Sequence, residues 1–148
     1  MLALTETLLP PDLLRPRSLA MLIGIYECNY RRLIELLGEP FDLPPCSRLR
    51  LRGRPLLYID RRAQSRYTLE LRLTHLFAGE RLPDLRVRLY RDARLAEALA
   101  PAPCAGNDPL ADLPARWRAN LLLYKWLEYC LDSRRKANCP APALARAH

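Results

Sequence analysis

The strongest constraint on the fold is a series of segments between residues 48 and 90 in which apolar and polar side chains alternate. In the clearest segment, 66–75, apolar residues alternate with Arg66, Thr68, Glu70, Arg72 and Thr74. Successive side chains of a strand point to opposite faces, so Tyr67 to Leu73 are expected to face a core. The pattern predicts strands at 48–52, 56–61, 66–75 and 85–90. Residues 93–99 fit a fifth strand, although their alanines and leucines also permit a helix.

Two segments with helical periodicity flank these strands. Residues 18–37 carry apolar side chains at helical spacing, with Ser18 as the expected N-cap and Gly38 as the stop. Residues 115–134 repeat this periodicity, and the glycine and proline in 78–84 indicate a loop. This order predicts an α+β fold, in which an antiparallel meander of four to five strands is covered on one face by an N-terminal and a C-terminal helix.

The length of 148 residues, with 50% hydrophobic and 27% charged residues, is typical of one globular domain. We expect an extended, proline-containing lead-in at 1–17, a single α+β domain at 18–134 and a flexible tail at 135–148. No apolar stretch approaches the ~20 residues of a membrane span, and the N-terminus lacks the basic start of a secretory signal. Five cysteines without C-x-x-C spacing suit a reducing compartment, so a cytoplasmic location is predicted.

Arginine dominates the charge of this chain, which has a formal net charge of +8. If the alternating apolar residues face the core, seven arginines share the opposite face: Arg48, Arg50, Arg52, Arg66, Arg72, Arg86 and Arg88. Glu70 is the only acid expected among them. Guanidinium groups bind phosphates and carboxylates, so this face is a candidate site for an anionic partner. The competing interpretation is a solvated surface that reflects arginine-rich codon usage.

Patterns typical of catalysis or metal binding are lacking. There is no glycine-rich phosphate loop or nucleophile elbow, and the cysteines and histidines lack metal-ligand spacing, so no cofactor or metal is expected. His75 lies on the core side of its strand and is interpreted as a hydrogen-bonded structural residue. Cys28 and Cys130 are predicted to be buried thiols. Only Tyr58 and Tyr90 could stack bases on the arginine face, which argues against an RNA-recognition-motif sheet.

Three stretches resemble the YqiB-like family of proteobacterial proteins: 26–30 in the first helix, 82–97 around the central hairpin, and 120–131 in the last helix. The resemblance covers about residues 18–134. It implies a cytosolic domain of unknown function and singles out the polar positions Glu27, Asn29, Arg88, Tyr90, Asp92 and Asn120. The chain departs from the family pattern at 101–116, where Arg116 takes the place of a lysine. If that segment carries a shared function, the departure indicates that this chain has altered it.

Three functions are compatible with these observations. The first is a non-catalytic protein-interaction module, whose partner is an acidic protein surface or a second copy of the chain. The alternative is binding of RNA or another phosphate-bearing ligand through the arginine face, with affinity that falls steeply with salt. The third is an enzyme that uses Glu27, Arg88 and Asp92 around a pocket, which requires these three side chains to converge. No membrane partner is expected.

Overall fold

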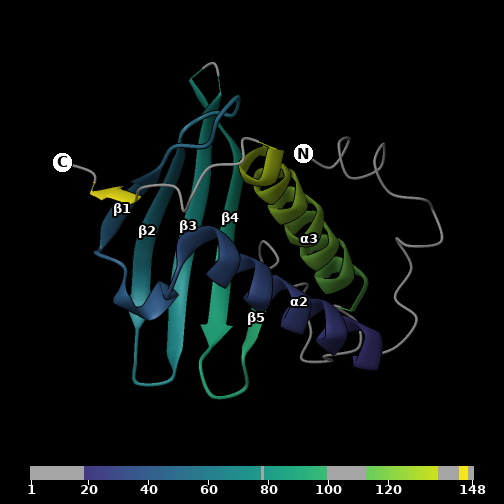
Figure 1. Cartoon of the computed structure of the whole chain (residues 1–148). Helices are drawn as coiled ribbons and strands as arrows, with labels where there is room; N and C mark the ends of the chain where they lie inside the picture. The colour runs from purple at the N-terminus through teal and green to yellow at the C-terminus, as the bar shows by residue number, and fades with distance from the viewer. Residues whose placement is uncertain (1–18, 78, 100–112, 137–143, 147–148) are drawn as a thin grey trace.

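The computed structural model describes residues 19–77, 79–99, 113–136 and 144–146. The strands form one antiparallel sheet in the order β5-β4-β3-β2-β1-β6. Figure 1 shows this sheet with its two helices. The elements are α2 (Leu19–Leu37), the 3-10 helix η2 (Pro40–Asp42), β1 (Cys46–Leu49), β2 (Leu57–Gln64), β3 (Thr68–Phe77), β4 (Glu80–Tyr90), β5 (Leu95–Ala98), α3 (Leu113–Lys136) and β6 (Leu144–Arg146). The predicted α+β fold is confirmed, with a sixth strand that the alternation did not predict.

One face of the sheet forms the core together with both helices. Its alternating apolar residues are at most 1% exposed, as the alternation predicts: Leu49, Leu57, Ile59, Leu69, Leu71, Leu73, Val87 and Leu89. They pack in one cluster with Leu33 of α2 and Leu127 of α3. Burial of each such side chain contributes about 1.5–3 kcal/mol, so the helices are held on this inner face. The opposite, outer face carries the polar residues of the same strands.

The third strand begins later than the alternation predicts. Tyr67, which the alternation places in the core, is 49% exposed, so that prediction is wrong. The cause is a local turn, in which the backbone N–H of Ser65 donates to Thr68 O at 2.8 Å and the two hydroxyls are hydrogen-bonded. The Ser65 hydroxyl also accepts from the Thr68 N–H at 3.2 Å. Side chains such as serine stabilise turns in this way, and Arg66 consequently lies in the turn, outside the sheet.

The fourth strand begins earlier than predicted, at Glu80, so the expected loop at 78–84 is wrong for residues 80–84. The pairing register shifts between Thr74 and Leu76, where two residues of β4 lie opposite one residue of β3. Proline has no N–H to donate to a sheet and is tolerated at such a bulge, which accounts for Pro83 inside a strand. As a result, Asp84 pairs with Thr74 and joins the outer face.

The boundaries of the remaining helices and strands differ less from the predicted boundaries. Residues 95–98 form β5, so the helical alternative for 93–99 is excluded. The last helix begins at Leu113 and continues to Lys136. Within the expected tail, Leu144–Arg146 pairs with β1 as an edge strand. The rest of the tail beyond Lys136, the lead-in at 1–17 and the segment 100–112 lie outside the described residues.

His75 connects β3 to α3 inside the core. Trp126 Nε1 donates a hydrogen bond to His75 Nδ1 at 3.4 Å, and the two rings meet edge to face with their centroids 5.2 Å apart. The imidazole is 2% exposed, and burial together with the charge of Arg54 lowers the pKa of His75 to about 4. His75 is therefore neutral at pH 7 and has the predicted structural role.

Acid is expected to destabilise the protein through His75. The unfolded histidine titrates near pH 6.5 and the folded one near pH 4, so only the unfolded state takes up this proton as the pH first falls. The contribution of neutral, buried His75 to the free energy of unfolding is fully present above about pH 6.5 and declines as the pH falls toward 4. Between pH 7 and 5 the loss is about 2 kcal/mol. Urea unfolding at pH 7 and pH 5 should show that the free energy of unfolding falls less for His75→Gln than for the wild type. Equal falls in the two proteins would contradict the role of His75 in the acid sensitivity.

Candidate functional site

The seven predicted arginines do not form one surface. Three of them lie on two neighbouring strands of the outer face: Arg72 on β3, and Arg86 and Arg88 on β4. The other four lie toward the ends of strands: Arg48 on β1, Arg50 and Arg52 in the connection to β2, and Arg66 in the turn before β3. The two groups have different electrostatic surroundings.

Arg72 is compensated by Asp84 across the β3–β4 pair. Its Nε and Nη2 donate to the two carboxylate oxygens of Asp84 at 2.8 and 2.7 Å, and the Thr74 hydroxyl donates to Oδ1 at 3.1 Å. The hydrogen bond from Arg72 lowers the pKa of Asp84, while the same bond raises the pKa of Arg72. Partly exposed pairs of this kind stabilise a fold by about 0–1 kcal/mol. The main consequence is that Arg72 contributes little net charge to the face.

Glu70 is shared by Arg86 and Arg88. Arg86 Nη2 lies 2.7 Å from one carboxylate oxygen, and Arg88 Nη2 lies 3.4 Å from the other. The Glu70 side chain is only 12% exposed, whereas those of Arg86 and Arg88 are 58% and 44% exposed. The hydrogen bond from Arg86 lowers the pKa of Glu70, so the carboxylate is ionised at neutral pH. Each guanidinium has five N–H donors, and both therefore retain donors for a partner.

A hydrogen-bonded network continues from Arg88 to the edge of the sheet. The Tyr90 hydroxyl donates to Glu97 Oε1 at 2.6 Å, and Arg88 is hydrogen-bonded to Tyr90. Tyr26 of α2 lies near the same Glu97 side chain, whose negative charge acts on the phenol. Burial, followed by the charge of Glu97, raises the pKa of Tyr26 to about 12, and burial also raises the pKa of Tyr90. Both phenols are thus protonated donors at neutral pH. We call Tyr26, Glu70, Arg88, Tyr90 and Glu97 the Arg88 network.

Asn120 closes the free edge of β5. Its Oδ1 accepts from the Ala98 N–H at 2.7 Å, and its Nδ2 donates to the carbonyl oxygens of Ala98 at 3.3 Å and Arg116 at 2.8 Å. Asn29 Nδ2 donates to the Asn120 backbone oxygen at 3.4 Å, and both asparagines are fully buried. An edge strand exposes unpaired backbone groups, and here a side-chain amide satisfies them. Asn29 and Asn120 are therefore structural anchors.

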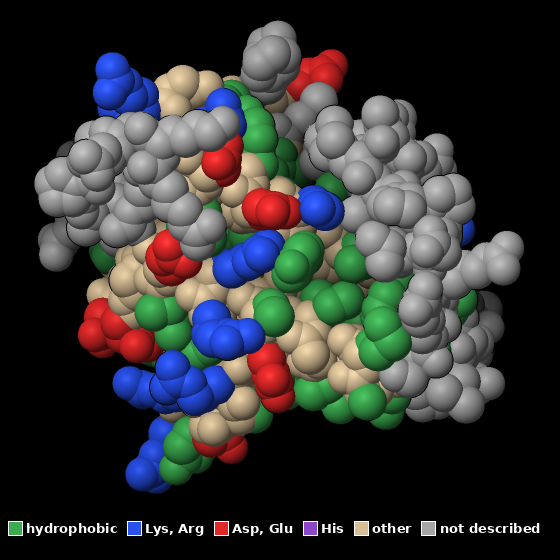
Figure 2. All heavy atoms as spheres, turned by 45° about the vertical axis from the view of Figure 1, so that its right-hand side comes forward, with side chains coloured by type: hydrophobic (Ala, Val, Ile, Leu, Met, Phe, Trp, Pro, Cys, Tyr) green, Lys and Arg blue, Asp and Glu red, His purple; other side chains and the backbone are tan. Residues whose placement is uncertain are grey.

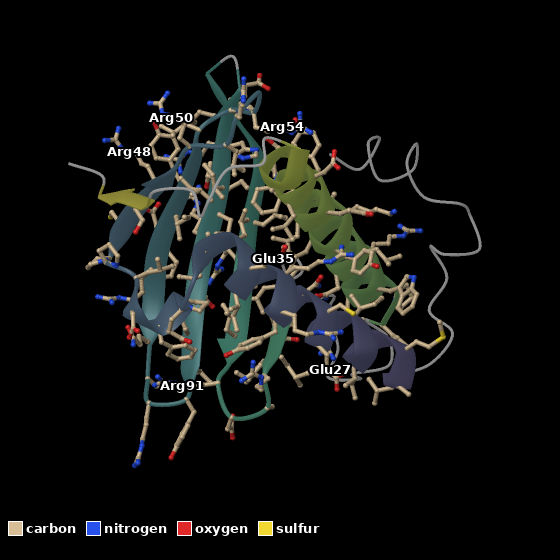
Figure 3. All side chains as sticks on the ribbon, in the orientation of Figure 1. Glu27, Glu35, Arg48, Arg50, Arg54 and Arg91 are labelled. Atoms are coloured by element: carbon tan, nitrogen blue, oxygen red, sulfur yellow. The ribbon has the colours of Figure 1, made fainter. Side chains whose placement is uncertain are left out.

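The polar positions proposed for an enzyme do not converge. Glu27 is exposed on α2, and Asp92 is exposed in the turn after β4. Figure 3 shows Glu27 well separated from Arg91, the neighbour of Asp92. Within the described ranges, no hydrogen bond or ion pair joins Glu27 or Asp92 to Arg88. The geometric requirement of that hypothesis is not met. The described histidines, cysteines and acids also include no group that could hold a metal ion.

Several further arginines hold elements of the fold together by stacking on aromatic rings. Arg32 also donates from Nη1 to the backbone oxygen of Tyr124 at 2.9 Å. The guanidinium-to-ring distances are 3.8 Å for Arg32–Tyr124, 3.7 Å for Arg54–Tyr129, 4.8 Å for Arg91–Phe41 and 5.5 Å for Arg94–Tyr30. Such contacts contribute about 0.5–2 kcal/mol each. Part of the arginine content therefore has a structural role. The sequence analysis considered only an anion-binding face and a solvated surface, and did not include this role.

The three described cysteines are free thiols. Cys130 is fully buried as predicted, and burial raises its pKa to about 12. Cys28 is only partly buried and accepts a hydrogen bond from Arg31 at 3.3 Å, so the prediction of full burial is wrong there. Cys46 is exposed, and its hydrogen bond to Asp60 raises the pKa of the thiol. The raised pKa values of Cys46 and Cys130 disfavour the thiolate form that a nucleophile needs.

Sequence reasoning missed two members of the site. Asp84 was expected in a loop, although it has the same parity as Arg86 and Arg88 along the chain, which was the available signal. Tyr26 was expected only as part of the apolar face of the first helix. No local pattern indicates that its hydroxyl meets Glu97, because this contact depends on how α2 passes the edge strand β5.

The helix side of the molecule has a different character. Figure 2 shows positive and negative side chains interleaved with hydrophobic ones on the side that faces right in Figure 1. Charges of one sign are thus not gathered there. Neither helix in the described part of the chain is long and apolar enough to cross a membrane.

Residues 32–136 match a family model described as a protein of unknown function, DUF1249. The chain belongs to the DUF1249 family. The DUF1249 match includes β1 to β5, α3 and residues 32–37 at the end of α2, so it contains the Arg88 network except Tyr26. No curated protein and no solved structure matches the chain. The segment 101–116, which departs from the expected family pattern, is described from Leu113 onward. The positive charge of Arg116 in this segment opposes the rise in the pKa of Tyr26.

Replacing Asn120 by alanine should lower the free energy of unfolding by roughly 2–4 kcal/mol, because the buried N–H and carbonyl of Ala98 lose their partner. Amide exchange should accelerate more in β5 than in β2. Urea unfolding and hydrogen exchange measure both effects. Gln64→Ala, at the exposed end of β2, is the control and should change stability by no more than about 0.5 kcal/mol. Equal effects of the two substitutions would exclude the edge-closing role.

Proposed function

We propose that this DUF1249 protein is a non-catalytic interaction module that binds an acidic protein surface through Arg86 and Arg88. The observation that carries the proposal is the arrangement of charges around Glu70. The carboxylate lies recessed beneath two guanidinium groups that are 58% and 44% exposed. One carboxylate is thus shared by two guanidinium groups, and both guanidinium groups keep exposed N–H donors that can reach a partner's carboxylates.

The recessed carboxylate also reduces the cost of binding. An arginine side chain loses about 2 kcal/mol of rotamer entropy when it becomes fixed. Arg86 and Arg88 are already oriented by Glu70, and Arg88 is oriented further by Tyr90, so less freedom remains to be lost on association. Arginine and tyrosine are also enriched in protein–protein interfaces.

The surrounding charges favour a protein over a polyphosphate at this face. Asp84 is 35% exposed beside Arg72, and Glu97 accepts from Tyr90 next to Arg88. A continuous row of phosphates would meet these carboxylates and be repelled. A protein surface carries charges of both signs and can place its own carboxylates opposite Arg86 and Arg88 alone.

We further infer that the protein is YqiB-like within the DUF1249 family and cytoplasmic. The residues at 26–30, 82–97 and 120–131 support the narrower assignment, and they include Asn29 and Asn120, which anchor the fold. Three free thiols among the described cysteines are in keeping with a reducing compartment.

The test is affinity capture with the tagged full-length chain from nuclease-treated cytosol, quantified by mass spectrometry. We expect a stoichiometric protein partner that the wild type retains and that Arg86→Glu/Arg88→Glu loses at least about tenfold, a change of 1.4 kcal/mol or more. Arg86→Gln/Arg88→Gln should lose less, because its amides can still donate to Glu70 and place no new negative charge beside it.

Arg31→Glu/Arg118→Glu is the matched control. It makes the same change in net charge at exposed positions of the two helices and should retain the partner. Thermal unfolding establishes that each variant is folded before capture. Equal retention by both glutamate variants, or loss of every partner on nuclease treatment of the wild type, would refute the proposal.

A further inference from the structure

Three of the remaining arginines lie where β1 turns into β2, namely Arg48, Arg50 and Arg52. Leu49 and Leu51 are buried, whereas Arg50 and Arg52 are exposed and Arg48 is partly exposed, so the alternation of β1 continues into the connection. In extended backbone, residues two apart are separated by about 6–7 Å. Arg48 and Arg50 are therefore neighbours along one end of the sheet, and Arg52 continues this row of cations into the turn between Leu51 and Arg54. Figure 3 shows Arg48 and Arg50 projecting in the same direction there.

These arginines lack the compensation found around Glu70 and Asp84. Among the residues that the structure describes, no ion pair involves Arg48, Arg50 or Arg52. Arg48 Nε is buried and has no hydrogen-bond partner in the described part.

The connection that carries the row is attached to α3. The Ser133 hydroxyl donates to the backbone oxygen of Arg52, and the Arg54 guanidinium lies 3.7 Å over the ring of Tyr129. The Arg54 N–H donates to Leu51 O at 3.1 Å, and Gly53 has φ +72°, which closes the turn. The connection that carries the row is therefore held against α3.

We propose that Arg48, Arg50 and Arg52 bind the phosphate backbone of single-stranded RNA. Arg48 and Arg50 have the spacing of an extended strand, Arg52 follows in the turn, and none of the three forms an ion pair with a described residue, an arrangement that fits the phosphates of one polynucleotide strand. Contacts to phosphates carry no sequence information, so binding of this kind is independent of sequence and dominated by release of counterions. This surface differs from the Arg86–Arg88 face, and the proposal stands independently of the protein partner.

The probe is a fluorescently labelled, mixed-sequence single-stranded RNA of about 20 nucleotides, titrated with the full-length protein at several salt concentrations. We expect Arg48→Gln/Arg50→Gln/Arg52→Gln to weaken binding at least about tenfold. The slope of log affinity against log salt should fall in magnitude by about 2, because each lost phosphate contact contributes about 0.7 for single strands.

Arg31→Gln/Arg81→Gln/Arg118→Gln is the matched control. It removes three charges at exposed positions on other elements and should weaken binding less than threefold. Circular dichroism checks that both variants are folded. Equal loss in the two triple variants would mean that net charge alone attracts RNA, and the site would be rejected. It would also be rejected if the wild type bound no RNA at low salt, or if poly-glutamate of equal length displaced RNA as well as unlabelled RNA does.

Discussion

An antiparallel sheet with helices on only one face must keep its charges on the other, and this asymmetry governs where the polar side chains of this protein lie. The inner face is apolar because it packs against Leu33 of α2 and Leu127 of α3. Every second residue of the same strands then points outward. Ionised groups there remain hydrated or pair with each other, since burying them alone would cost far more than the fold could recover. The ion pairs of Arg72 and Glu70 follow from this constraint.

The edges of the sheet impose a second requirement, because unpaired backbone groups invite association with other chains. Asn120 meets this requirement at β5, and β6 covers β1 at the opposite edge. The Asn120 contact also determines the site. It holds the start of α3 against β5, and through Asn29 it holds α2 there as well, which brings Tyr26 to Glu97. Closing the edge and assembling the Arg88 network are thus parts of the same packing arrangement.

The arginines of this chain have three different physical roles. Some, such as Arg32 and Arg54, stack on aromatic rings and connect elements of the fold. Those around Glu70 are partly neutralised and oriented, which suits them to a protein partner with charges of both signs. Those beside the β1–β2 turn form no ion pair with the described part of the chain, which suits them to a polyanion. The composition does not distinguish these roles, because they depend on which carboxylate or ring lies within reach of each guanidinium.

The sequence by itself determined the fold class, both helices, four of the strands and most of the residues that enter the core, because alternation and helical spacing are local properties of the chain, while residues 93–99 stayed open between strand and helix. It misplaced Tyr67 and Asp84, where a serine turn and a proline at a bulge interrupted the alternation. Only the tertiary structure decided which arginines are compensated. An ion pair such as Arg72–Asp84 requires the register between two strands, and the contact of Tyr26 with Glu97 requires the packing of a helix on an edge strand. Both depend on residues far apart in the chain, whose separation in space no local pattern encodes.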